Sequence, residues 1–228
     1  MPCGPDLAFS AAANLRQGVS LSAPPLSRLD VPAEEADRIR AAVRSADLTL
    51  LGARQVLAGH EHVEGLIALF ADRGVSDPIY DLPRPFTIPV IQGWVDEARA
   101  RREAGEALLA VSLDEAGQVA GYSYFTIWPE LSAAEIAGAR RADLQNSGEG
   151  GRGAARSFGW MFEHLGVRLI GLTASLDNIR SARVIEAAGF SPMGERSSIR
   201  PDGSERRSRY WEMTRESWRE RAGRSEER

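Results

Sequence analysis

Three apolar segments in succession constrain the fold more than any other feature of the sequence. They span residues 107–113, 118–128 and 133–140. The first two are separated by Asp114-Glu-Ala-Gly, a typical hairpin signal, and Pro129 stands ahead of the third. This arrangement predicts a meander of antiparallel strands.

After the meander the pattern alternates between helix and strand. Residues 148–153 are rich in glycine and open a helix, and residues 167–174 form a short apolar strand. A further helix is expected to begin at Asn178, a good capping residue, and to end at Gly189. Two last strands flank the turn at 201–204. The sequence therefore predicts an α/β (α+β) fold with a mixed, mostly antiparallel sheet of about seven strands and helices on both faces.

The segment ahead of the meander predicts one strand and two helices. Residues 48–56 are apolar enough for a strand. Apolar side chains at i, i+3, i+4 and i+7 indicate a helix over about 60–72. Thr87 is expected to cap the second helix, whose arginine-rich end suits a carboxyl terminus. Between the two helices, the prolines of Asp81-Leu-Pro-Arg-Pro-Phe predict a loop.

Composition divides the chain into three parts. Residues 1–45 hold five prolines, followed by a charged stretch in which Ile39 and Val43 share one face of a short predicted helix. The part before that stretch is interpreted as flexible or loosely docked. Residues 46–215 form the predicted domain, and residues 216–228 form a charged, solvated tail.

Charge and residue usage exclude several classes of function. The net charge of −4 is not that of a protein held on nucleic acid by phosphate contacts. One cysteine, Cys3, and three histidines, His60, His62 and His164, predict no disulfide framework and no metal site. There is no apolar run of the roughly 20 residues that a membrane span needs, and no secretory signal, so we expect a cytoplasmic protein.

The glycine-rich stretch Gln145-Asn-Ser-Gly-Glu-Gly-Gly-Arg-Gly153 is the first candidate binding site. Such a loop presents backbone N–H groups at the positive end of a helix, which suits a phosphate or pyrophosphate. A flexible turn leading into a helix explains the glycines equally well. A dinucleotide-binding loop would follow a buried parallel strand directly, whereas the stretch before this one is polar. The Gly-Lys-Ser/Thr ending of a P-loop is absent.

Three motifs in order resemble those of the GNAT superfamily of acyl-CoA N-acyltransferases. Gln145-x-x-Gly148-x-Gly150 resembles the family signature whose backbone amides bind the pyrophosphate of coenzyme A. Asn178-Ile-Arg-Ser181, followed by residues 184–190, is similar to the family's Asn-x-x-Ser…Gly-Phe helix. Upstream, residues 81–87 before a tryptophan-bearing helix resemble the ribosomal-protein-alanine N-acetyltransferase branch. The resemblance covers roughly residues 47–215.

The resemblance implies where the cosubstrate acetyl-CoA binds. Its pantetheine arm would pair with backbone groups at about 137–141, in a gap between two strands that move apart. Arg152 would reach a phosphate, although an exposed helix arginine is the commoner explanation. The implied binding residues are Ala139, Arg140, Gln145, Gly148, Gly150, Gly151, Arg152, Gly153, Asn178 and Ser181.

The resemblance also implies direct attack of an amine on the thioester in a ternary complex. Glu135 is the candidate general base, and an outward-facing strand carboxylate is the alternative interpretation. Ile185 stands where many family members carry a tyrosine that protonates the leaving thiolate. Ser181 is then the candidate catalytic substitute, as an acid or as an anchor for the sulfur. A serine that satisfies a backbone donor in the first helical turn is the alternative.

The resemblance therefore implies an N-acetyltransferase that acts on a primary amine, either a protein N-terminus or a small molecule. A non-catalytic acyl-CoA-binding or regulatory module is the alternative, favoured by the missing tyrosine. A dinucleotide-binding oxidoreductase fits the loop's context poorly. The expected partners are acetyl-CoA, an amine acceptor and a possible second copy of the chain, with no nucleic acid and no membrane.

Overall fold

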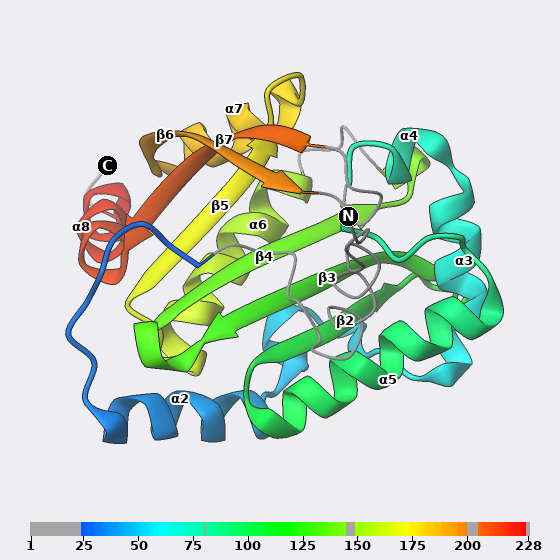
Figure 1. The fold of residues 1–228 in the computed structure, drawn as a ribbon, viewed down its shortest axis with the longest axis horizontal. Coiled ribbons are helices and arrows are strands. Elements are labelled where there is room, and N and C mark those ends of the chain that lie inside the picture. The colour runs from blue at the N-terminus through cyan, green and yellow to red at the C-terminus, as the bar shows by residue number, and fades with distance from the viewer. Residues whose placement is uncertain (1–23, 80, 145–148, 200–204, 227–228) are drawn as a thin grey trace, which may run out of the picture.

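A single sheet organises the described part of the chain, which comprises residues 24–79, 81–144, 149–199 and 205–226 of the computed structural model. The strand order within these residues is β1-β2-β3-β4-β5-β7-β6 (Figure 1). The strands are β1 (Gln55–Leu57), β2 (Ala107–Leu113), β3 (Val119–Trp128), β4 (Ala133–Arg140), β5 (Leu169–Ser175), β6 (Ser191–Ile199) and β7 (Glu205–Thr214). The α-helices are α2 (Ala33–Arg44), α3 (Val63–Ala71), α4 (Arg73–Ser76), α5 (Ile88–Ala104), α6 (Glu149–Trp160), α7 (Ile179–Ala188) and α8 (Arg215–Glu226). The shorter helical turns are η1 (Leu48–Leu51), η2 (His60–His62), η3 (Pro129–Leu131), η4 (Ala142–Leu144) and η5 (Met161–Leu165), the last of π type.

The pairing confirms the predicted mixed sheet. Strands β1 to β4 are a continuous antiparallel meander, and β5, β7 and β6 form a second antiparallel set. The two sets meet where β4 pairs with β5 in parallel. This parallel contact is expected because α6 and η5 carry the chain from the end of β4 back to the start of β5.

Strands β4 and β5 stay together for only part of their length. Their paired positions are Ala133 with Leu169 and Ala134 with Ile170. Along the rest of β4, the strand remains paired with β3 as far as Arg140, opposite Gly121. The sheet therefore opens on the β5 side of β4, at the end that leads into the glycine-rich segment.

Each face of the sheet carries its own hydrophobic core, as the alternation of side chains along β2 shows. Leu108 and Ala110 belong to a core with α2, α6, η5 and α7, whereas Leu109 and Val111 belong to a core with α3, α4 and α5. Successive residues of a strand point to opposite faces, so one apolar run supplies both cores. The prediction of helices on both faces is confirmed.

Three local expectations are corrected. The strand predicted at 48–56 is limited to β1, because Asp47 accepts hydrogen bonds from the backbone N–H and the hydroxyl of Thr49 and caps the helical turn η1 instead. Thr87 occupies the N-cap position of α5 but makes no side-chain capping bond. Residues 216–226 of the predicted tail are helical and belong to α8; most of their described side chains are exposed, but Trp218 packs against Phe162 at a ring-centroid distance of 5.5 Å.

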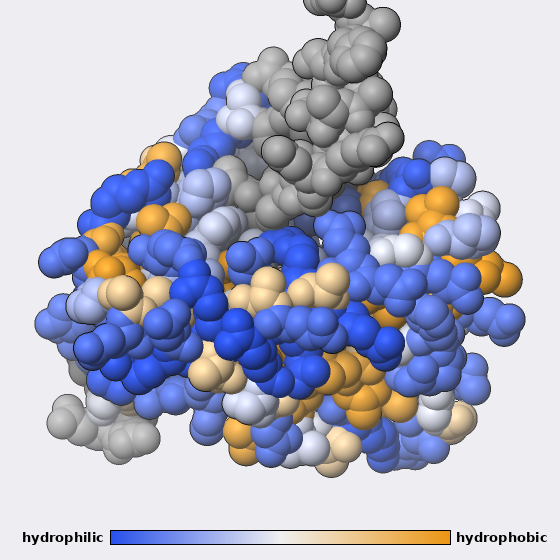
Figure 2. Space-filling model, turned by 60° about the horizontal axis from the view of Figure 1, so that its bottom comes forward, coloured by the Kyte–Doolittle hydropathy of each residue, from blue (hydrophilic) through white to orange (hydrophobic). Residues whose placement is uncertain are grey.

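The large apolar side chains exposed on the described part of the chain are Leu26, Leu50, Ile88, Ile179 and Met193. On the face seen in Figure 2, hydrophilic residues surround small apolar patches. Within the described ranges, no helix combines the length and the apolar character that a membrane crossing requires.

Candidate active site

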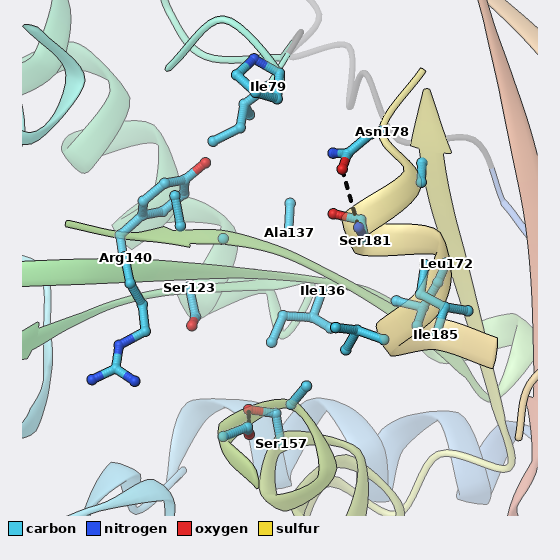
Figure 3. Close-up of a pocket in the computed structure, with 18 of the residues that line it drawn as sticks. Ile79, Ser123, Ile136, Ala137, Arg140, Ser157, Leu172, Asn178, Ser181 and Ile185 are labelled. Atoms are coloured by element: carbon cyan, nitrogen blue, oxygen red, sulfur yellow. Dashed lines mark hydrogen bonds between the residues drawn. The ribbon is translucent and has the colours of Figure 1, made fainter. Parts of the chain in front are cut away.

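A cleft of about 540 Å³ lies where β4 and β5 move apart. One wall is the β4 segment from Glu135 to Arg140, and the others come from α6, α7, β5 and the chain after α4. Ile136 and Ala137 of β4 face this space together with Asn178 and Ser181 of α7, as Figure 3 shows. The β4 edge that faces β5 is free of ladder pairing beyond Ala134 within the described residues. An extended ligand with amide groups fits such an edge.

The first turn of α7 forms one side of the cleft. Asn178 is the N-cap, and its Oδ1 accepts a hydrogen bond of 3.0 Å from the backbone N–H of Ser181. The predicted cap is therefore confirmed, and so is the helix end at Gly189, whose φ of 91° is left-handed. The capping bond uses only the backbone N–H of Ser181. The Ser181 hydroxyl does not take part in it and can contact a ligand in the cleft. Ile185 lines the cleft one turn further on and gives it an apolar wall.

Glu135 lies at the point where the two strands separate. Its side chain is only 7 % exposed, and the hydroxyl of Thr173 on β5 donates a hydrogen bond of 3.0 Å to its Oε1. Because Glu135 is opposite Thr126 and alternates with Ile136, it points to the face that carries α3 and α5. A side chain buried to this extent does not fit the alternative interpretation of Glu135 as an outward-facing strand carboxylate.

The glycine-rich segment is described only from residue 149 onward. Gly150, Gly151, Arg152 and Gly153 lie in the first turns of α6, and Gly153 lines the cleft. A side chain at Gly151 would meet no atom within 4 Å, so the glycine there is not explained by packing. Two of the predicted binding residues, Gln145 and Gly148, lie outside the described residues.

An ion-pair cluster holds the end of β4, where Ala139 and Arg140 line the cleft. Arg141 donates from Nη1 to Asp114 in the β2–β3 turn at 3.0 Å, and from Nε to Asp143 in η4 at 2.8 Å. These bonds tie the end of β4 to the β2–β3 turn and to η4. Arg140 itself extends toward the side of β4 on which α6 lies (Figure 3).

Asp81 and Tyr122 line the opposite part of the cleft, next to the chain after α4. Burial raises the pKa of Asp81, although a hydrogen bond from its own backbone and the charge of Arg206 oppose the shift. Burial and then the charge of Asp81 raise the pKa of Tyr122 well above its ordinary value. The Tyr122 hydroxyl therefore stays protonated and can act as a donor but not as a base.

The sequence did not indicate the residues that surround Glu135. Thr173 of β5 is opposite Tyr210 of β7, and the Tyr210 hydroxyl donates a hydrogen bond of 2.7 Å to Glu212. Burial raises the pKa of Tyr210, as do Glu212 and Glu135. The one signal in the sequence was that Thr173 and Ser175 are polar residues at alternate positions of the otherwise apolar strand β5. Without the register of β5 against its neighbours, this signal did not show which residues they face.

The fold and the cleft define a class of protein: a mixed-sheet α/β protein whose sheet opens between two parallel strands. Residues 54–191, more than half of the chain, match the family described as acetyltransferase (GNAT) domain. The chain therefore belongs to the GNAT acetyltransferase family, whose members use acyl-CoA. No curated protein sequence matches the chain.

Solved structures with the same fold include acetyltransferases of several bacteria. Ribosomal-protein-S5-alanine acetyltransferase from Vibrio fischeri is 16% identical with a TM-score of 0.61, over 72% of this chain and 93% of that one. RimJ from Mycobacterium smegmatis, in complex with CoA-disulfide, is 17% identical with a TM-score of 0.62, over 71% and 81%. An N-acetyltransferase from Staphylococcus aureus Mu50 is 16% identical with a TM-score of 0.55, over 70% and 96%. At these identities the likeness establishes the fold.

Proposed function

We propose that this protein transfers an acetyl group from acetyl-CoA to a primary amine, a protein N-terminus or a small molecule, by direct attack. The observation that carries the proposal is Glu135, a nearly buried carboxylate at the point where β4 and β5 separate. A carboxylate there is within the same cleft as Ser181 and the free edge of β4.

Acetyl-CoA supplies an activated thioester carbonyl and a thiolate leaving group. The amine nitrogen forms a bond to the carbonyl carbon, the carbon–sulfur bond breaks, and coenzyme A leaves. Glu135 takes the proton that the amine must lose, and Thr173 holds the carboxylate in place through its hydroxyl. Backbone N–H groups of β4 and the Ser181 hydroxyl are the donors available to the oxygen and the sulfur.

The residues that would hold coenzyme A come from three elements. Backbone groups of β4 near Ala139 and Arg140 offer pairing to the pantetheine arm, and Asn178 and Ser181 stand opposite them. The amino-terminal turns of α6 offer backbone N–H groups to the pyrophosphate. Gly153 of these turns lines the cleft, and an added Cβ at Gly151 or Gly153 would meet no atom within 4 Å, so a ligand in the cleft can approach the backbone there.

A non-catalytic acyl-CoA-binding module is the second candidate. Ile185 supports it, since the apolar side chain lines the cleft where a tyrosine acid would otherwise stand. A thiolate is a fair leaving group without an acid, so the chemical step does not require that tyrosine.

Replacing Glu135 separates the two candidates. We expect Glu135→Gln to lower kcat by about 10²–10⁴-fold, because general-base catalysis contributes about that much. Thiol release from acetyl-CoA is measured against a panel of amines that includes N-terminal peptides and polyamines. Glu115→Gln, a change at a side chain that is 89 % exposed, is the matched control and should keep the wild-type rate.

If Glu135→Gln keeps its melting temperature and its turnover, Glu135 is not the base. If wild type binds acetyl-CoA yet releases no thiol with any amine in the panel, the binding-module candidate is favoured.

A further inference from the structure

The chain ahead of α2 lies against the last two strands. We call residues 24–27 the N-terminal strap. The guanidinium of Arg196 on β6 donates to the carbonyl of Pro24 at 2.9 Å, and Pro25 is buried. In Figure 1 this part of the chain, in blue, passes in front of β5 before it turns down to α2. The strap therefore covers the sheet face on which Glu135 lies.

Glu212 of β7 anchors the strap. Its side chain is 4 % exposed, and its Oε1 accepts hydrogen bonds from the backbone N–H groups of Leu26 at 2.6 Å and Ser27 at 3.1 Å. The Tyr210 hydroxyl donates to the same oxygen at 2.7 Å. Burial alone would raise the pKa of Glu212, but the bonds from Ser27, Tyr210 and Leu26 outweigh it and hold that pKa below its ordinary value. Glu212 is thus a fixed, buried negative charge.

Tyr210 connects this charge with Glu135. Its hydroxyl lies over Gly171 so closely that a Cβ added there would be 2.4 Å from the oxygen. Since Ala134 is paired with Ile170, the next residue along each strand brings Glu135 beside Gly171. The Tyr210 hydroxyl is therefore situated next to Glu135 but donates its hydrogen bond to Glu212.

We propose that the N-terminal strap and Glu212 are a positioning assembly that keeps Glu135 basic. The proposal rests on the proposed function, in which Glu135 takes the amine proton. Two effects act in the same direction. Glu212 engages the Tyr210 hydroxyl, which would otherwise donate to Glu135 and stabilise its charged form. The charge of Glu212 also disfavours a second negative charge nearby.

Other charged groups line the cleft that holds Glu135. Asp81 and Arg206 also line the cleft, with Arg206 at an alternate position of β7 that shares a face with Tyr210 and Glu212. The guanidinium of Arg196 lies 4.6 Å from the Tyr210 ring centroid. From β3 and β5 the neighbours are the neutral residues Thr126 and Thr173. Because these groups are present in wild type and in both Glu212 variants, a shift in the proton affinity of Glu135 that appears in Glu212→Gln and not in Glu212→Asp is assigned to the charge of Glu212.

The first test is the pH profile of kcat/KM with one amine for wild type, Glu212→Gln and Glu212→Asp. Removing the charge should make Glu135 a stronger acid, so the acidic limb of the Glu212→Gln profile should move to lower pH by about one unit. Glu212→Asp keeps the charge and should return the limb toward its wild-type position. An unmoved limb in a folded Glu212→Gln protein would overturn the proposal.

A second pair of variants tests the strap without touching a catalytic or charged side chain. Leu26→Pro removes the backbone N–H that donates to Glu212, whereas Leu26→Ala retains it. Leu26→Pro should move the limb in the same direction as Glu212→Gln by a smaller amount, and Leu26→Ala should not. Equal profiles for the two variants would contradict a role for the strap.

Direct titration separates failure of this proposal from failure of the proposed function. Carboxyl resonances of ¹³C-glutamate-labelled protein are followed with pH, and Glu135 is assigned by comparison with Glu135→Gln. The resonance should titrate at lower pH in Glu212→Gln than in wild type even if no amine is turned over. An unchanged titration overturns the proposal whether or not the protein is an active transferase.

Discussion

At the scale of single residues, contacts between near neighbours in the sequence could be predicted, whereas contacts between distant residues could not. Asn178 was predicted as a cap because its bond spans three residues, and the 3.0 Å contact with Ser181 confirms it. The bond from Thr173 to Glu135 joins residues that lie 38 positions apart. It depends on how β4, β5 and β7 are aligned, and residue type alone does not specify that alignment.

Replacement of Asn178 should lower stability, whereas replacement of Ser181 should lower turnover. Asn178→Ala removes the capping oxygen and should lower the free energy of unfolding by about 1 kcal/mol. Ser181→Ala leaves the capping bond intact, because that bond uses the backbone N–H, and should lower turnover with little change in stability. Chemical denaturation and thiol release measured on the same two variants check this. Equal stability loss in both would mean that Ser181 serves the helix rather than the cleft.

At the scale of elements, strands with alternating patterns and clear turns were predictable. The segments predicted at 107–113 and 133–140 are the bounds of β2 and β4. The apolar run at 48–51 was misassigned, because a side-chain cap from Asp47 competes with strand pairing and the sequence gives no measure of which prevails. The mixed sheet could be predicted from the order of helices and strands. The opening between β4 and β5 could not, because it depends on which residues of the two strands are paired.

A substitution in the first turn of α6 should raise the stability of the protein and weaken its binding of coenzyme A. Gly151→Ala places a methyl group where no atom lies within 4 Å and should stabilise the helix by about 1 kcal/mol. If the backbone there approaches a pyrophosphate, the same methyl group should weaken coenzyme A binding. Gly93→Ala in α5 is the matched control, since its added methyl also meets nothing within 4 Å and α5, unlike α6, contributes no residue to the cleft lining.

Calorimetric titration with coenzyme A and thermal unfolding supply the two readouts. Binding that is unchanged in Gly151→Ala would remove this position from the proposed site, whatever its effect on stability.

At the scale of the whole molecule, both ends of the described chain pack on the sheet's core. Helix α2 contributes Ile39 and Val43, which are 1 % and 0 % exposed, although composition had set residues 1–45 apart. Helix α8 is charged overall, yet Trp218 reaches the core and Arg215 donates to the carbonyl of Val167 at 2.9 Å. Charge density predicted exposure correctly for most of α8 but not for these anchoring side chains. The domain boundary at residue 45 stays a prediction.

A ligand that binds only the folded state must stabilise the molecule as a whole, and this gives the most direct test of the central claim. Melting temperature is measured with acetyl-CoA, coenzyme A and NAD side by side. We predict a rise with both coenzyme A species and none with NAD, equivalent to about 2.7 kcal/mol when ligand is 100-fold above its Kd. No rise at millimolar coenzyme A, or an equal rise with NAD, would contradict the assignment of this cleft as an acyl-CoA site.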